Sequence, residues 1–371
     1  MRSGLKAAGG VLLLLGLYLG LWPVPVDPIA WEPPPDTTGS GPYADNRRLD
    51  PLESIDIGDH HGPEDLAIDA QGRIYVPTED GTILRVSPDR DGSSGTKVES
   101  IANTKGRPLG IELDARGNLL VADAFLGLLQ VSPDGEVTVL ADEADGVPIL
   151  YADDLDIARD GKVYLSDAST RFGAKRAGST MLASRLEIIE HRRSGRLLEY
   201  DPATGKARTL LDGLSFANGV AVAHDDSFVL VNETGEYRVI RYHLRGPKAG
   251  THDVFIDQLP GFPDNIGRGL DGVYWLALIA PRNKLLDRMA DSPMLRRLVL
   301  RLPQVMQPQP VPHAHLLSLD RNGRVLDDLQ RSGADALYTG ASETADHLYL
   351  GSLTSPDLKR WRKRGLAPRP R

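Results

Sequence analysis

Five oxygen-bearing side chains draw attention first, because four of them occupy one position of a repeated pattern. They are Glu64, Asp153, Asn218 and Asp264, with Asn265 directly after the last. Hard cations prefer carboxylate and amide oxygens, and Ca²⁺ accepts about six to eight of them in loose geometry. Three carboxylates brought close together repel one another, so protons or a cation must neutralise them. We therefore predict that the four residues bind Ca²⁺ and that Asn265 contacts the substrate beside it.

The alternative interpretation is that these residues are ordinary turn residues, since Asp and Asn are common in turns. Taken singly, each would be explained that way. Their recurrence at matched positions favours the metal site. It also requires a fold that brings distant segments of the chain together.

A repeated segment supplies that fold. Copies begin at residues 63, 108, 152, 217, 263 and 337, and "PEDLAIDAQGRIYV" and "ADDLDIARDGKVYL" are two of them. Each copy has a short apolar strand, a turn with Gly or Asp, and a second apolar strand. In every copy the second strand holds the residue twelve positions after the candidate position. The shorter spacings, about 45 residues, match the period of propeller blades.

The predicted fold is therefore all-β, a six-bladed β-propeller over residues 51–362 with four strands in each blade. Equivalent positions of successive blades face the central channel, so the candidate residues should meet at one mouth of it. The segment "LESIDI", 52–57, is predicted to pair with the last blade and close the ring.

Two intervals between copies are longer than the rest, and each contains a segment with helical periodicity. These segments are 177–194 and 283–306. We predict two helical insertions at these places. The second, rich in Leu, Met and Arg, could cover the channel mouth, rest on anionic lipid or pack against the side of the propeller.

The N-terminus predicts a membrane anchor. Arg2 and Lys6 precede the uncharged segment 7–26, which as a helix would span roughly 30 Å. We predict a cytoplasmic tip and signal-anchor helix at 1–31, a linker at 32–50 and a basic tail at 363–371. The protein would then be a single-pass membrane protein with a cytoplasmic N-terminus and a periplasmic or otherwise extracytoplasmic propeller. A cleavable signal is the alternative.

Composition excludes some functions. The net charge of −8 argues against a nucleic-acid partner, which would need a basic face. The chain has no cysteine, so thiolate metal sites and cysteine nucleophiles are excluded.

Longer motifs add a resemblance. "DDLDIARDGKVYLSDAS", "GRLLEYDPATGKARTLLDGLSFANGVAV" and "HLYLGSLTSP" resemble the strictosidine-synthase-like family, in order, over roughly residues 55–360. Its wider superfamily includes gluconolactonases and paraoxonases. The resemblance implies a six-bladed propeller with Ca²⁺ at the channel mouth. It also implies Glu64, Asn218 and Asp264 as ligands, with Asp153 and Asn265 completing the set.

We expect a membrane-anchored, calcium-dependent hydrolase of lactones or aryl esters, in which water attacks and Asp153, or second Asp264, is the base. A strictosidine-type condensation is disfavoured, because Thr339 or Gly340 stands where that family uses a catalytic Glu. The paraoxonase mechanism is also disfavoured, because Leu109 replaces its His. The remaining alternative is a non-catalytic binding scaffold with a structural cation.

Overall fold

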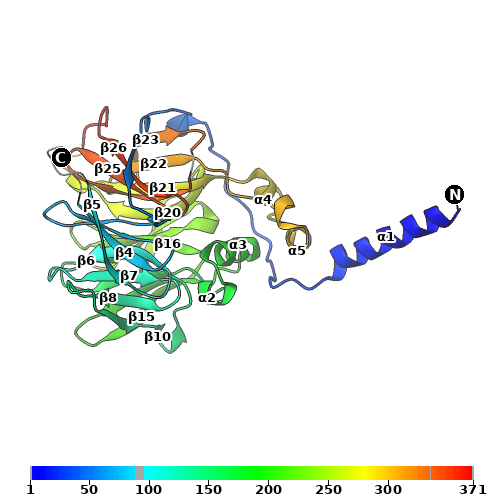
Figure 1. Cartoon of the computed structure of the whole chain (residues 1–371), viewed down its shortest axis with the longest axis horizontal. Helices are drawn as coiled ribbons and strands as arrows, with labels where there is room; N and C mark the ends of the chain where they lie inside the picture. Colours follow the sequence, from blue (N-terminus) through cyan, green and yellow to red (C-terminus); the bar gives the residue numbers. More distant parts are fainter. Residues whose placement is uncertain (1, 88–95, 335, 370–371) are drawn as a thin grey trace.

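The computed structural model describes residues 2–87, 96–334 and 336–369. Six four-stranded antiparallel sheets form the six blades of a propeller, as predicted (Figure 1). Residue 1 of the predicted N-terminal tip and residues 370–371 of the predicted basic tail lie outside the described residues.

The blades follow one another along the chain. Blade 1 consists of β2 (Ala67–Ile68), β3 (Ile74–Pro77), β4 (Thr82–Ser87) and β5 (Lys97–Asn103), and blade 2 of β6 (Pro108–Leu113), β7 (Leu119–Asp123), β8 (Gly127–Val131) and β9 (Val137–Ala141). Blade 3 consists of β12 (Ala152–Ile157), β13 (Val163–Asp167), β14 (Gly195–Asp201) and β15 (Lys206–Leu214), and blade 4 of β16 (Ala217–Val222), β17 (Phe228–Glu233), β18 (Arg238–His243) and β19 (His252–Ile256). Blade 5 consists of β20 (Gly261–Arg268), β21 (Tyr274–Pro281), β22 (Ala314–Leu319) and β23 (Val325–Arg331).

Blade 6 joins the two ends of the propeller. Its strands are β24 (Tyr338–Glu343), β25 (His347–Ser352), β26 (Asp357–Arg362) and β1 (Glu53–Asp56). β1 runs antiparallel to β26, with Ile55 opposite Leu358. The predicted closure of the ring by residues 52–57 is therefore confirmed.

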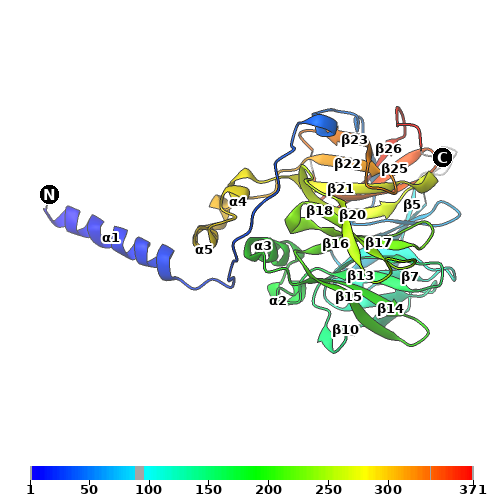
Figure 2. The same cartoon turned by 180° about the vertical axis from the view of Figure 1, so that it is seen from behind.

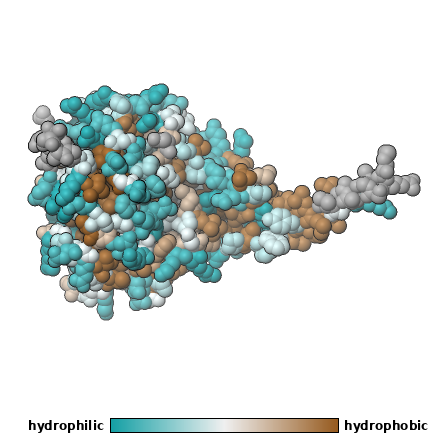
Figure 3. Space-filling view, in the orientation of Figure 1, coloured by the Kyte–Doolittle hydropathy of each residue, from teal (hydrophilic) through white to brown (hydrophobic). Residues whose placement is uncertain are grey.

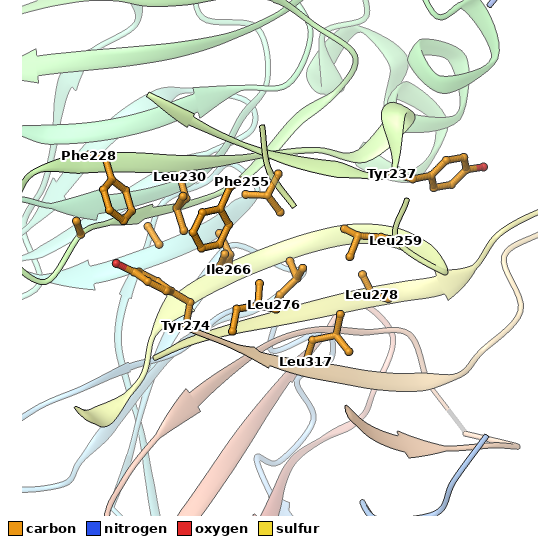
Figure 4. Close-up of a cluster of buried hydrophobic side chains, with 14 of the residues drawn as sticks. Phe228, Leu230, Tyr237, Phe255, Leu259, Ile266, Tyr274, Leu276, Leu278 and Leu317 are labelled. Atoms are coloured by element: carbon orange, nitrogen blue, oxygen red, sulfur yellow. The ribbon is translucent and has the colours of Figure 1, made fainter. Parts of the chain in front are cut away.

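The core explains the twelve-residue regularity of the repeat. The residues at that offset all have zero exposure: Val76, Val121, Leu165, Leu230, Leu276 and Leu350. They pack between neighbouring sheets. Figure 4 shows this between blades 4 and 5, where Leu230 of β17 faces Ile266 and Leu276. Burial of apolar surface between blades is thus what fixes the pattern.

Both predicted helical insertions are confirmed, and they occupy the same place in two blades. α2 (Ala174–Ala177) and α3 (Thr180–Glu190) connect β13 to β14 of blade 3. α4 (Lys284–Arg288), α5 (Pro293–Leu300) and the 3-10 helix η4 (Gln304–Met306) connect β21 to β22 of blade 5. Each therefore links the second and third strands, so both emerge on one face, on either side of blade 4 (Figure 2).

The remaining elements are short. β10 (Glu143–Ala144) pairs with β11 (Val147–Pro148), and the 3-10 helices are η1 (Gly41–Tyr43), η2 (Thr234–Glu236) and η3 (Leu270–Gly272).

The prediction of an N-terminal membrane anchor is wrong. α1 (Arg2–Leu21) projects from the propeller in Figures 1 and 2. Within the described residues, however, no helix is both long enough and apolar enough to span a bilayer. The helix includes Lys6 and ends at Leu21. Its charge-free part is therefore roughly 22 Å long, against roughly 30 Å of hydrocarbon. The predicted single-pass localisation depended on this anchor and is corrected with it.

An extended segment after α1 runs along the two insertions. Ile29 N donates to the Glu190 carbonyl at the end of α3, and Trp31 N donates to the Ala290 carbonyl after α4. The Arg282 guanidinium donates to the carbonyls of residues 34 and 35 at 2.7 and 2.9 Å. Residues 27–35 thus connect α3 to the α4–α5 insertion.

Candidate active site

The residues predicted to converge do so at the floor of one cavity, which we call the upper cavity. It has a volume of about 200 Å³ and lies between the channel mouth and the two helical insertions. Glu64, Asp153, Asn218 and Asp264 all line it, and none of them is more than 5% exposed. They come from blades 1, 3, 4 and 5.

A shift of strand register in the inner strands of blades 3, 4 and 5 sets the direction of three of these side chains. The antiparallel register shifts between Ala152 and Leu155, between Ala217 and Val220, and again between 263 and 266. Each shift encloses one candidate residue and the residue after it. A bulge of this kind redirects side chains and is common beside active sites.

The second residue of a bulge packs against the neighbouring blade. Gly219 lies so close to blade 5 that a Cβ atom there would be 2.5 Å from the Asp264 carbonyl oxygen. Only glycine fits at that approach. The pattern "ANG" is therefore what allows Asn218 to lie beside Asp264.

Two hydrogen bonds organise the floor. Asn218 Nδ2 donates to Asp264 Oδ1 at 2.6 Å, and Asn265 Nδ2 donates to Glu64 Oε1 at 3.0 Å. The other oxygen of each acceptor, Asp264 Oδ2 and Glu64 Oε2, is buried without a partner among the described residues, as is Asn218 Oδ1. A buried acceptor without a donor costs free energy, so these three oxygens suit a ligand that carries positive charge or donates hydrogen bonds.

The pKa values of the carboxyl groups at the floor are raised above their ordinary range. Burial, followed by the charge of Asp264, raises the pKa of Glu64 and that of Asp153 well above their usual range. Burial raises the pKa of Asp264 to about 7, against the opposing hydrogen bond from Asn218. A bound cation would favour the charged forms instead.

These residues fit a hard cation by their chemistry. The unpartnered atoms are carboxylate and amide oxygens, the donor types that Ca²⁺ takes. In the part of the chain that the structure describes, no three His, Cys, Asp or Glu side chains already converge to hold one ion. The Ca²⁺ site thus stays a prediction, supported by the unpartnered oxygens.

Asn265 lies differently from the other four. It lines a second cavity of about 190 Å³ further along the channel, which we call the lower cavity. The carboxylates of the lower cavity are Asp65, Glu112, Asp154 and Asp156. Asn265 thus sits between the two cavities, joined to Glu64 by its amide. The contact between Asn265 and a substrate stays a prediction.

Sequence reasoning missed a residue that supports the floor of the upper cavity. Asn232 Nδ2 donates to the Asp264 carbonyl, and its Oδ1 is one more buried acceptor unpartnered within the described chain. A signal was present, because in five of the six copies a polar residue stands fourteen positions after the candidate position, at or just after the end of an apolar strand. The members of this series are Thr78, Asp123, Asp167, Asn232 and Ser352.

Among the described residues, the sixth blade brings no carboxyl group into the lining of the upper cavity. Thr339 Oγ1 donates to the Glu64 carbonyl. Glu343, the next acid after Thr339 and Gly340 in the sequence, forms ion pairs with Lys363 at 2.6 Å and Arg369 at 2.8 Å. Its carboxylate is therefore engaged in the scaffold of blade 6.

Comparisons with known proteins agree with this architecture. The family model "Strictosidine synthase" matches residues 153–247, and "Strictosidine synthase-like, N-terminal" matches residues 41–86. Protein STRICTOSIDINE SYNTHASE-LIKE 10 of Arabidopsis thaliana is 35% identical over 352 residues, which cover 88% of this chain and 90% of that one. The adipocyte plasma membrane-associated protein of Salmo salar is 35% identical over 384 residues, covering 96% and 89%. The chain belongs to the strictosidine synthase-like family.

Solved structures place the fold in a wider group of propellers. A gluconolactonase from Xanthomonas campestris superposes with a TM-score of 0.60 at 16% identity, covering 91% of this chain and 96% of that one. Regucalcin of Agrobacterium tumefaciens, described as a calcium-binding protein, gives a TM-score of 0.57 at 14% identity, covering 86% and 96%. At this identity the likeness establishes the fold alone.

Proposed function

We propose that the protein is a calcium-dependent hydrolase of lactones or aryl esters that acts in the upper cavity. The observation that carries the proposal is the group of buried oxygens without partners in the described structure, Glu64 Oε2, Asn218 Oδ1 and Asp264 Oδ2, at the floor of a largely apolar cavity. The propeller neighbours described as a gluconolactonase and a calcium-binding protein are consistent with it.

Glu64, Asn218 and Asp264 would hold the cation, which when bound supplies Lewis-acid polarisation of an ester carbonyl. Asp153 lines the same cavity and is our first choice for the base that takes a proton from the attacking water, with Asp264 second. The floor residues are at most 5% exposed, and buried surroundings of this kind strengthen electrostatic effects on the reacting group.

The test is hydrolysis of phenyl acetate and of several lactones in Ca²⁺ and in EDTA. We expect turnover in Ca²⁺, its loss in EDTA and its return when Ca²⁺ is restored. Asp264→Asn should abolish the calcium-dependent part. Asp134→Asn, an exposed carboxylate in a turn of blade 2, is the matched control and should behave as wild type.

Turnover that EDTA does not change would overturn the calcium dependence. A Ca²⁺-dependent rise in melting temperature without hydrolysis of any substrate would instead support the alternative, a binding scaffold with a structural cation.

A further inference from the structure

We propose that the substrate carries a long apolar chain or an aromatic ring and not a polyhydroxylated sugar ring, an inference that rests on the proposed hydrolase function. The helical insertions carry the argument, because they supply much of the wall of the upper cavity. The apolar wall residues from α3 are Met181, Ile188 and Ile189, and those from the α4–α5 insertion include Leu286, Met289 and Val299. The polar wall residues of these helices are Thr180, Ser184, Arg185 and Arg296.

Several polar side chains of the wall are already engaged with the protein. Tyr151 Oη donates to the Thr180 carbonyl at 3.2 Å, and Thr234 Oγ1 donates to the Pro263 carbonyl at 2.6 Å. Two arginines of the wall are engaged in part, although Arg296 Nε is buried without a partner in the described structure. Arg296 Nη1 donates to the Ile189 carbonyl at 2.9 Å, and the Arg185 guanidinium donates to a glutamine side chain at 2.7 Å.

This engagement selects against a polyol. Most hydroxyls of a sugar lactone would leave water and meet aliphatic side chains or donors that already have a partner in the protein. A buried hydroxyl without a partner loses binding free energy, whereas a methylene group gains it. The unpartnered oxygens lie together at the floor, so one polar group of the substrate belongs there and the rest should be apolar.

The apolar wall also continues out of the cavity. Val311 lines the upper cavity and is 64% exposed, and Met294 and Val305 of the same insertion region are 71% and 90% exposed. In Figure 3 hydrophobic residues gather toward this end of the molecule, whereas hydrophilic residues cover most of the propeller. An apolar chain longer than the cavity could therefore follow this surface.

The experiment is a ladder of lactones assayed with the full chain in Ca²⁺: δ-valerolactone, δ-octalactone, δ-decanolactone and glucono-δ-lactone. We expect kcat/KM to rise up to about 4-fold for each added methylene group, through KM, and glucono-δ-lactone to be the poorest substrate. Ile188→Gln should flatten this rise. Leu182→Gln, on the same helix but outside the cavity and 43% exposed, should leave it unchanged.

A binding measurement separates this inference from the proposed function. Decanoate and gluconate share a carboxylate, and calorimetric titration compares them without any hydrolysis. Tighter binding of decanoate, weakened by Ile188→Gln and not by Leu182→Gln, supports the apolar class even if no ester is turned over. The inference is overturned if gluconate binds as well as decanoate, if glucono-δ-lactone is the best substrate, or if both variants keep the wild-type ladder.

Discussion

The upper and lower cavities lie along the same channel and both contain several carboxylates, yet their hydrogen bonding differs. In the lower cavity every carboxylate accepts at least one backbone N–H. The donors are Ile111 N to Asp65, Leu113 N to Glu112, Val220 N to Asp154 and Val222 N to Asp156. In the upper cavity Glu64 and Asp264 each keep one buried oxygen that is unpartnered in the described structure.

This difference separates carboxylates that stabilise the fold from carboxylates that are available to bind a ligand. Asp65 joins blade 1 to blade 2, and Asp154 and Asp156 join blade 3 to blade 4, because their donors lie on the neighbouring inner strands. These carboxylates hold the ring together. In the upper cavity Asp264 and Glu64 each accept one side-chain amide from another blade, but each keeps a second oxygen that is available to a ligand. The number of carboxylates therefore does not identify the ligand-binding site. What identifies it is that some carboxylate oxygens have no hydrogen-bond donor in the described protein.

The largest expected effect is on catalysis at the upper cavity. Asp264→Asn should lower kcat/KM for a long-chain lactone by about 10³-fold, or ~4 kcal/mol, because it removes a ligand charge. In EDTA the same variant should unfold at the same or a higher urea concentration, since one of several repelling carboxylates is gone. A large loss of stability in EDTA would place Asp264 in the scaffold instead.

The opposite behaviour is expected at the lower cavity. Asp156→Ala removes the acceptor of two backbone N–H groups and the ion pair with Arg268 at 2.6 Å. The free energy of unfolding should fall by about 3 kcal/mol. Urea unfolding measures the loss, with the exposed Asp134→Asn as control. If Asp156→Ala were as stable as wild type, the contrast between the cavities would fail.

Calcium binding gives a smaller but diagnostic shift. A ligand that binds only the folded state adds about 2.7 kcal/mol of stability at 100 times Kd, which should raise the melting temperature by several degrees. Asp264→Ala should lose most of this shift. Asp65→Asn, at the lower cavity, should start from a lower melting temperature and keep the shift. Equal loss in both variants would contradict the assignment of the ion to the upper cavity.

The smallest effect concerns pH. Burial, with Asp156 as the nearest like charge, raises the pKa of Glu112 to about 7 in the folded state. The unfolded chain releases this proton near pH 4.3. Between these values the folded state holds more protons, so this group lowers stability as pH rises, by less than about 1.4 kcal/mol per pH unit, and has no further effect above about 7.

Glu112→Gln tests this sign. Its stability relative to wild type should increase from pH 5 to pH 7 and then stay constant, as followed by urea unfolding at each pH. A difference that does not change with pH would show that Glu112 is ionised throughout.

The propeller was predictable because burial between blades imposes one pattern on every copy. Val76, Leu230 and Leu276 are equivalent residues with zero exposure, and none could be polar without cost. The meeting of Glu64, Asp153 and Asp264 followed from the same symmetry, since equivalent positions of a propeller face one channel.

The rest depended on features that a sequence pattern does not contain. The direction of Asn265 is set by the bulge in β20, which sends successive side chains to different cavities. The chemistry of the cavity wall depends on which face of α3 lies inward. Ile188 lines the upper cavity, whereas Leu182 of the same helix lies outside it. The membrane anchor was inferred from an uncharged run, but the helix ends at Leu21.

The closure of the ring has a consequence for synthesis on the ribosome. β1 is among the first segments to emerge, and its partner β26 is among the last, with about 300 residues between Ile55 and Leu358. Blades 1 to 5 can assemble from consecutive hairpins as they leave the exit tunnel, whereas β1 must wait unpaired. Its exposed edge could pair with another nascent chain, so the final step of folding is also the one most sensitive to crowding on a polysome.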